Sequence, residues 1–174
     1  MAHQAAFVFS CFTGLRLSDA RTLTWRKVYK TPDGKTLYIH VFMQKTQKPN
    51  NIPLSQEALN CLQAKDDLDE PIFTLPASDA TINYHVKKLV KAAGIEKKVS
   101  FHCSRHTFAT MMLTLGVDIY TTSKLLGHAN VTTTAIYAKI VDKKKVDAMN
   151  LVNDLFTKDD NTENYEDRTT QPQA

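Results

Sequence analysis

Paired cysteines, long apolar runs and glycine-rich loops are all missing from this chain of 174 residues. The three cysteines, Cys11, Cys61 and Cys103, are odd in number and lack metal-type spacing, so we expect reduced thiols in an intracellular, cytoplasmic protein. No apolar run approaches the ~18 residues of a membrane-spanning helix. The N-terminus also lacks a basic segment followed by an apolar stretch, which argues against a secretory signal.

Charge is unevenly distributed along the chain, whose formal net charge is +4. Residues 1–156 contain 20 Lys and Arg against 13 Asp and Glu, whereas residues 157–174 contain 2 against 5. A basic domain suits a DNA partner, although many unrelated soluble proteins carry similar charge. Residues 157–174 contain only two aliphatic or aromatic side chains. We therefore predict one domain over residues 1–156 and an acidic, disordered tail.

Alternating side chains near the N-terminus predict a small three-stranded antiparallel sheet. Strands are expected over residues 25–29, 37–43 and 51–54, because Asp33-Gly34 is typical of a hairpin and a second turn is expected over residues 47–50. A helix is expected before the sheet, over residues 2–12, with Phe7, Val8 and Cys11 on one face. Ser18 is expected to cap a short helix over residues 19–23.

The rest of the chain is predicted to be helical, which makes the fold class α+β and mainly helical. Ser55 is expected to cap the first of these helices, and Phe108, Met111, Met112 and Leu115 to pack on one face of another. Glycines follow three of the segments directly and are expected to end them. The predicted helices cover residues 55–65, 78–93, 104–115, 118–126, 132–139 and 142–156.

Three short motifs carry the chemistry: TGLRLSDA at 13–20, HCSRHTFAT at 102–110 and LLGHANVTTTAIY at 126–137. Arginine grips phosphate oxygens with a permanently charged fork, and histidine moves protons near neutral pH. A tyrosine phenol can form a covalent phosphoryl intermediate. With neither a metal-ligand cluster nor a phosphate-cradling glycine loop nearby, the set predicts metal-free attack by tyrosine on a phosphodiester. Its members are Arg16, His102, Arg105, His128 and Tyr137.

These motifs resemble the catalytic domain of the tyrosine recombinases, the lambda-type phage integrase family. That family has T-G-x-R, an acidic residue three positions later, a lysine on a β-hairpin, H-x-x-R-H, and L-G-H followed by a tyrosine. All of them occur here in the family's order, over about residues 5–140. The matching positions are Thr13-Gly14-Leu15-Arg16, Asp19, Lys45, His102-Cys103-Ser104-Arg105-His106, Leu126-Gly127-His128 and Tyr137.

The resemblance implies how the phosphate would be held. Arg16 and Arg105 would bind its non-bridging oxygens, His128 would add a third donor, and Asp19 would orient the Arg16 fork. Alone, Arg16 and Asp19 could equally form a surface ion pair.

The resemblance also implies how protons would move around Tyr137, the nucleophile. His102 would be the general base in cleavage, and a lysine in the turn after the second strand would protonate the leaving 5′ oxygen. Lys45 directly follows the strand and is favoured over Lys48. His106 is expected only to cap or buttress the site.

The implied activity is cleavage and rejoining of double-stranded DNA through a 3′-phosphotyrosyl intermediate, without metal, ATP or another cofactor, as in site-specific recombination and integration of mobile elements. Two alternatives are a type IB topoisomerase, which rejoins the same strand, and a non-catalytic DNA-binding module, although no catalytic position is missing. A zinc site at His102, Cys103 and His106 is disfavoured, because a closed site needs four ligands.

Family members usually carry an N-terminal core-binding domain, which this chain lacks, so we expect it to be part of a larger protein. They act as tetramers on DNA, and the helix over residues 141–156 is expected to dock into a neighbouring subunit. Alone, the domain is expected to be a monomer. The predicted stripe on this helix comprises Val141, Val146, Met149, Val152, Leu155 and Phe156.

Overall fold

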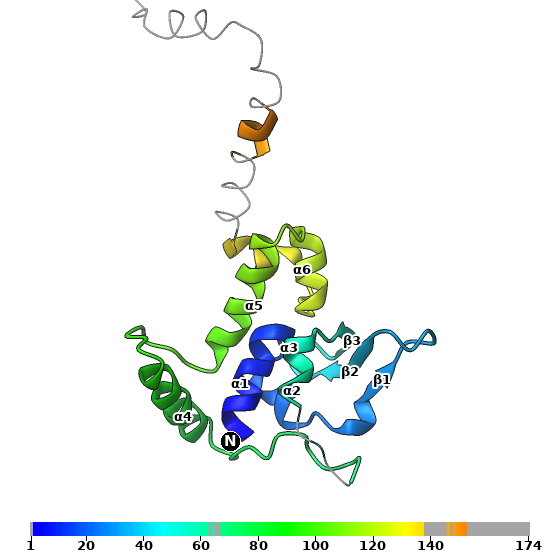
Figure 1. The fold of residues 1–174 in the computed structure, drawn as a ribbon, viewed down its shortest axis with the longest axis vertical. Helices are drawn as coiled ribbons and strands as arrows, with labels where there is room; N and C mark the ends of the chain where they lie inside the picture. Colours follow the sequence, from blue (N-terminus) through cyan, green and yellow to red (C-terminus); the bar gives the residue numbers. More distant parts are fainter. Residues whose placement is uncertain (1, 63, 65–66, 138–145, 147, 153–174) are drawn as a thin grey trace, which may run out of the picture. The chain divides into compact units, whose positions relative to one another are not determined.

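Helices surround a small sheet in the computed structural model, which describes residues 2–62, 64, 67–137, 146 and 148–152. The chain divides into two units, residues 1–137 and 138–174. The first has the predicted α+β class (Figure 1). In chain order its elements are α1 (Ala2–Thr13), α2 (Leu17–Arg21), η1 (Trp25–Lys27), β1 (Val28–Lys30), β2 (Leu37–Met43), β3 (Lys48–Pro53), α3 (Gln56–Leu59), α4 (Asp79–Ala92), α5 (His102–Thr114), α6 (Ile119–Leu125) and η2 (Val131–Tyr137).

The sheet is antiparallel, as predicted, and its strand order is β1-β2-β3. The first strand begins at Val28 rather than at residue 25, because residues 25–27 form η1. Ile39 of β2 pairs with Val28 on one side and Ile52 on the other. The predicted alternation along β2 is confirmed, because Ile39, Val41 and Met43 are buried whereas Phe42 is 55% exposed. The sheet therefore presents one apolar face to the core.

The second turn lies earlier than predicted. It occupies residues 44–47, and Gln47 takes a left-handed φ of 51° there, so Lys48 and Pro49 already belong to β3. Proline favours a turn over a strand interior because it cannot donate to a sheet ladder, but β3 is an edge strand that tolerates it. The prediction that Lys48 lies in the turn is therefore wrong.

The core-facing side of α1 differs from the prediction. Ala6 and Phe9 are fully buried, whereas Phe7, Val8 and Cys11 are only partly buried. Helix α1 packs against α3, α4 and α5 and lies among them in Figure 1. Because neighbours cover it on several sides, the most apolar stripe is not the deepest one.

Helix boundaries were only partly predictable. Ser55 accepts a hydrogen bond from the Ala58 amide as expected, but α3 ends at Leu59 rather than near residue 65. Helix α2 begins at Leu17 with Arg16 at its N-cap, so Ser18 lies inside the helix and does not cap it. The segment that ends at Tyr137 is a 3-10 helix over residues 131–137.

Helices α4, α5 and α6 follow the predicted segments closely. A glycine lies two residues after the C-terminal end of each helix. Leu115 was expected to pack, but it is 71% exposed and Leu113 is buried in its place. The α5 helix also begins two residues earlier than predicted, at His102. This places His102 and Arg105 on the same helix.

The predicted free thiols are confirmed, since Cys11, Cys61 and Cys103 are all unpaired. Among the described helices, none combines the length and apolar character needed to cross a bilayer. The helix predicted over residues 142–156 is helical at its described positions, 146 and 148–152. The remainder of that helix and the tail predicted over residues 157–174 lie outside the described residues.

Gly14 lies where the loop after α1 meets a small second core of Phe108, Ala109 and Leu126. Its φ is +70°, a left-handed conformation that residues with a Cβ rarely adopt. A Cβ at this position would lie 2.7 Å from Phe108 Cδ1 and 2.9 Å from Leu126 Cδ2, closer than side chains normally approach. Glycine is therefore required here by both the backbone and the space.

We predict that Gly14→Ala lowers the free energy of unfolding by about 2–4 kcal/mol, which combines left-handed strain with overpacking. Gly94→Ala is the matched control: its φ is +72°, but nothing lies within 4 Å of the position that a Cβ would take. That variant should lose only about 1–2 kcal/mol from backbone strain. Urea unfolding at 25 °C measures both values, and equal losses would show that the contact with Phe108 and Leu126 is unimportant.

Candidate active site

A cleft of about 150 Å³ gathers all six residues predicted to be catalytic. They come from distant parts of the sequence: the start of α2, the β2–β3 turn, the first turns of α5, the loop after α6 and the end of η2. Three further side chains, from α5 and η2, complete the wall. The lining residues are Arg16, Lys45, His102, Arg105, His106, His128, Thr133, Ile136 and Tyr137.

Helix α5 supplies three of these side chains from one face. His102, Arg105 and His106 stand at positions i, i+3 and i+4, which are neighbours on a helix surface. The rings of His102 and His106 meet edge to face with centroids 4.8 Å apart. The H-x-x-R-H motif is therefore one face of a helix turned toward the cleft.

Arg105 is 4% exposed, and its guanidinium donates hydrogen bonds to the protein backbone. Its Nη1 donates to the Gly14 carbonyl at 2.6 Å, and its Nη2 donates to the Leu126 carbonyl at 2.5 Å. Burial and then the nearby Arg16 charge lower the pKa of Arg105 to about 9, so it is still protonated at pH 7. Arg105 thus connects the loops that carry Arg16 and His128 while it lines the cleft.

The Arg16 guanidinium is less completely hydrogen-bonded than that of Arg105. Its Nη1 is buried but has no hydrogen-bond partner, and no carboxylate forms a salt bridge with it among the described residues. Burial lowers the pKa of Arg16, and the charge of Asp19 acts in the opposite direction. A buried donor without an acceptor is costly, and an anion in the cleft would satisfy it.

Asp19 is fully buried, and its Oδ1 accepts a hydrogen bond from the Gln44 amide at 3.0 Å. Its Oδ2 has no hydrogen-bond partner within the described part of the chain. The predicted contact that orients the Arg16 fork is therefore an electrostatic interaction rather than a hydrogen bond. The Gln44 contact, which the sequence did not indicate, fixes the turn that carries Lys45 against α2.

The two candidate lysines lie in different places, although both are exposed. Lys45 lines the cleft beside Arg16 and Arg105. Lys48 lines a neighbouring hollow of about 190 Å³ with Lys124 and His128. This placement favours Lys45 as the lysine nearest the predicted reaction centre.

Both predicted histidines lose basicity in the cleft. Burial first, then Arg105, Arg16 and Lys45, lower the pKa of His128 to about 4, so its ring is neutral at pH 7. Its Nδ1 lies 2.8 Å from Oγ1 of the buried Thr134, a contact not expected from the sequence. Burial also lowers the pKa of His102, followed by the charges of His106, Arg105, Arg16 and Lys45.

The Tyr137 hydroxyl lies 2.5 Å from Nδ1 of His106. Burial raises the pKa of Tyr137, while the Arg105 charge acts in the opposite direction. His106 was expected to cap or buttress the site, and its direct contact with the phenol was not predicted. The sequence places His106 one helical turn after His102, and so on the same face of α5, but it does not indicate the contact with Tyr137.

Metal-ligating residues do not gather in the part of the chain that the structure describes. No group of three His, Cys, Asp or Glu side chains there is placed to hold a metal ion. His102, Cys103 and His106 accordingly do not form the zinc cluster that their spacing could suggest.

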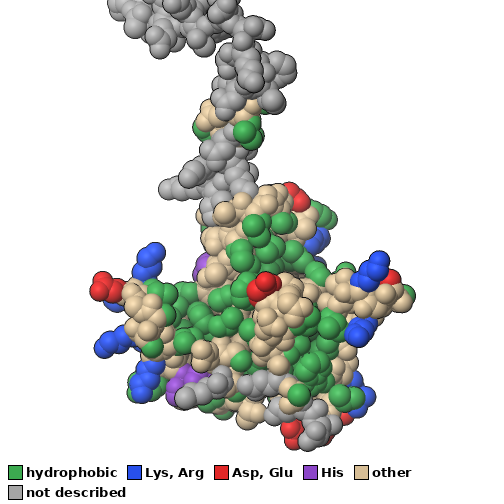
Figure 2. Space-filling view, in the orientation of Figure 1, with side chains coloured by type: hydrophobic (Ala, Val, Ile, Leu, Met, Phe, Trp, Pro, Cys, Tyr) green, Lys and Arg blue, Asp and Glu red, His purple; other side chains and the backbone are tan. Residues whose placement is uncertain are grey.

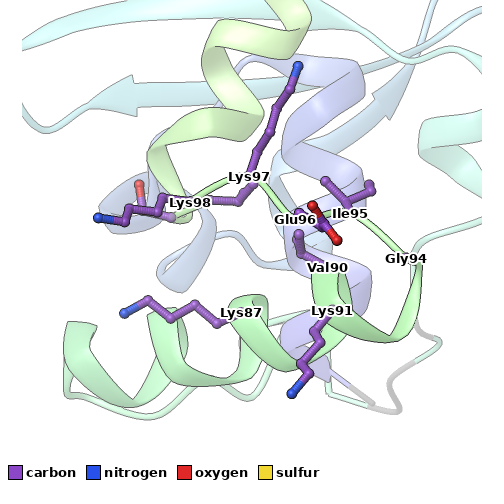
Figure 3. Close-up of a pocket in the computed structure, with 10 residues that line it drawn as sticks. Lys87, Val90, Lys91, Gly94, Ile95, Glu96, Lys97 and Lys98 are labelled. Atoms are coloured by element: carbon purple, nitrogen blue, oxygen red, sulfur yellow. The ribbon is translucent and has the colours of Figure 1, made fainter.

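A larger hollow, of about 890 Å³, contains none of these catalytic candidates and lies between α4 and the loop over residues 94–100 (Figure 3). Val90, Ile95 and Val99 give it apolar walls. Four lysines lie on its rim, and in Figure 3 Lys87 and Lys98 extend to the same side whereas Lys97 and Lys91 extend upward and downward. In Figure 2 basic side chains project at this edge of the molecule, while hydrophobic and uncharged side chains fill much of the face between the edges.

Comparisons with known proteins identify the family to which the chain belongs. A sequence model of the Phage integrase family matches residues 1–144. A tyrosine recombinase of Thermosipho africanus is 33% identical over 144 residues, which cover 79% of this chain and 50% of that protein. One of Pseudothermotoga lettingae is 31% identical over 146 residues, covering 80% and 50%. The chain spans about half the length of these relatives.

Solved structures show the same fold. The XerA recombinase superimposes with a TM-score of 0.67 at 26% identity, covering 84% of this chain and 56% of that one. The catalytic domain of bacteriophage HP1 integrase gives a TM-score of 0.59 at 28% identity, covering 78% and 73%. Family sequence, fold and the residues of the cleft agree, and the chain belongs to the phage integrase family of tyrosine recombinases.

Proposed function

We propose that this domain cleaves and rejoins double-stranded DNA, with Tyr137 as the nucleophile. The observation that carries the proposal is the position of the Tyr137 hydroxyl in one cleft with Arg16, Arg105 and Lys45. A phenol, two guanidinium groups and an ammonium group provide a nucleophile, phosphate ligands and a proton donor.

In the proposed step, Oη of Tyr137 attacks the scissile phosphorus and the bond from phosphorus to the 5′ oxygen breaks. The DNA is then joined to the protein through a 3′-phosphotyrosyl bond. Arg16, Arg105 and neutral His128 donate to the non-bridging oxygens, where negative charge increases in the transition state. A proton on the Nδ1 side of His128 would face Thr134, so the useful tautomer carries its proton on Nε2.

The remaining proton transfers involve the leaving oxygen and the phenol. Lys45 protonates the 5′ oxygen as it leaves, and takes that proton back when the strand is rejoined. The phenolic proton passes to a histidine of the cleft, for which the sequence favoured His102. Because the phosphotyrosyl bond retains the free energy of the phosphodiester, rejoining needs neither ATP nor a metal ion.

The substrate class is supported by charge and by relatives. Residues 1–156 are basic, which favours a polyanion. A XerH recombinase bound to its difH substrate has the same fold, with a TM-score of 0.62 at 22% identity. Site-specific recombination is favoured over topoisomerase-like relaxation because the relatives named above are recombinases. Assembly as a tetramer on DNA through residues 141–156 is part of the proposal.

We predict that Tyr137→Phe abolishes covalent attachment to DNA. A nicked suicide substrate, from which the short fragment with the free 5′ hydroxyl diffuses away, should trap a denaturation-resistant protein–DNA adduct with the wild-type protein. Gel electrophoresis in detergent detects the adduct. Tyr120→Phe is the matched control, since Tyr120 is 57% exposed on α6 and does not line the cleft. Adduct formation by the Tyr137 variant would remove this residue from the nucleophile's role.

We predict that Lys45→Ala slows cleavage by roughly 10²–10⁴-fold, the usual contribution of a general acid. A 5′-bridging phosphorothiolate substrate should restore the rate, because sulfur leaves without a proton. Single-turnover cleavage measures both rates. Lys48→Ala is the comparison from the neighbouring hollow and should keep most of the activity on the ordinary substrate. The opposite pattern would assign the proton to Lys48.

We predict that the two arginines differ in their effect on folding. Arg105→Ala should lower the free energy of unfolding by about 2–5 kcal/mol, because it leaves two carbonyls without their charged donor. Arg16→Ala should leave it unchanged or raise it, because an unpaired buried donor disappears. Both should lose cleavage by at least about 10²-fold. Chemical unfolding and single-turnover cleavage separate the two effects, and equal stability losses would contradict the distinction.

A further inference from the structure

We propose that His106, rather than His102, accepts the phenolic proton of Tyr137 during strand cleavage. The proposal rests on the cleavage activity proposed above and assigns one further catalytic residue to it. His106 touches a reacting atom directly, which is the first requirement for a general base.

The geometry of the contact supports this assignment. Nδ1 of His106 lies 2.5 Å from Oη of Tyr137, within the range of short hydrogen bonds that involve a hydroxyl. The two rings lie at 62° with centroids 5.9 Å apart. His102 forms no hydrogen bond with Tyr137 among the described contacts, and its ring instead meets the edge of His106. His102 is therefore placed to restrain the His106 ring.

The proposal specifies the direction of this hydrogen bond. Burial raises the pKa of Tyr137, so at pH 7 the phenol keeps its proton. A neutral phenol can donate through its O–H or accept on its oxygen, and the tautomer of His106 decides between the two. In the proposed arrangement the phenol donates, so His106 carries its own proton on Nε2 and its Nδ1 takes the phenolic proton.

The surrounding charges couple this transfer to substrate binding. His102 and Arg105 on α5, Arg16 before α2, Lys45 in the β2–β3 turn and His128 after α6 share the cleft with His106. Cations among these groups repel any further positive charge in the cleft. The scissile phosphate brings negative charge into the cleft, and the transition state adds more, which offsets the charge of the transferred proton.

The step balances without another reactant. As the bond from Oη to phosphorus forms, the phenolic proton passes to Nδ1 of His106. As the bond from phosphorus to the 5′ oxygen breaks, Nζ of Lys45 protonates that oxygen. In rejoining, the 5′ hydroxyl returns its proton to Lys45 and attacks phosphorus, while the departing phenolate recovers its proton from His106.

The test compares His106→Asn and His102→Asn in single-turnover cleavage of the suicide substrate. Asparagine can place a hydrogen-bonding amide near the position of Nδ1, but it cannot accept a proton at neutral pH. We expect His106→Asn to slow cleavage by about 10²–10⁴-fold and His102→Asn to slow it less. Comparable thermal midpoints show that the variants remain folded.

Replacement of Tyr137 by 3,5-difluorotyrosine separates proton acceptance from positioning. Fluorine lowers the pKa of the phenol, so the nucleophile needs less help from a base. We expect this replacement to restore most of the rate in His106→Asn but not in Arg16→Ala, whose loss concerns the phosphate. Rescue of His102→Asn instead, or wild-type rates in His106→Asn, would overturn the role of His106. Failure of the wild-type protein to form an adduct would contradict the proposed cleavage activity itself.

A measurement on the DNA-free protein determines which tautomer of His106 is present. Nitrogen-15 chemical shifts from long-range proton–nitrogen spectra identify which ring nitrogen of His106 carries the proton. We expect the Nε2–H form in the unchanged chain. A proton on Nδ1 would mean that His106 donates to Tyr137, and that result would overturn the proposal whatever the cleavage rates.

Discussion

The cleft depends on the two hydrogen bonds that the Arg105 guanidinium donates to backbone carbonyls. The Gly14 and Leu126 carbonyls belong to separate loops, one leading into Arg16 and the other into His128. A guanidinium has five N–H donors in a rigid plane, so it can hold both loops and still face the cleft. The same buried side chain thus links the loops that carry the other two proposed phosphate ligands, Arg16 and His128.

Without DNA, the positive charges of Arg16, Lys45 and Arg105 in the cleft are poorly balanced by negative charge among the described residues. Asp19 is a buried carboxylate beside the cleft, and it is already engaged by the Gln44 amide. Burial is the main cause of the lowered pKa values of Arg105 and His128, and the neighbouring cations lower them further. Nη1 of Arg16 is buried without a partner in the described part of the chain. A preorganised site of this kind accepts a stability cost in the free protein, because its donors are already aimed at charge that arrives with the substrate.

The sequence predicted the fold class, the sheet and the members of the cleft better than it predicted their contacts. Motif order identifies residues such as Arg16 and Tyr137, but side-chain directions depend on tertiary packing. The α1 face was misjudged because several helices cover it, and Lys48 was misplaced because Pro49 is compatible with an edge strand as well as with a turn. The roles of the predicted site residues stay predictions, and the contact between His106 and Tyr137 joins two elements that no local pattern relates.

The outer edge of β3 has a consequence for how the protein associates with copies of itself. The Leu54 amide donates to Leu37, so alternate residues point away from β2, and positions 49, 51 and 53 face outward. Two of these are prolines, which leaves the Asn51 amide as the donor on that edge. Strand-by-strand polymerisation needs a row of free amides, and this edge offers almost none. In the proposed assembly of several copies on one DNA, this edge strand protects the protein from adding copies through its sheet.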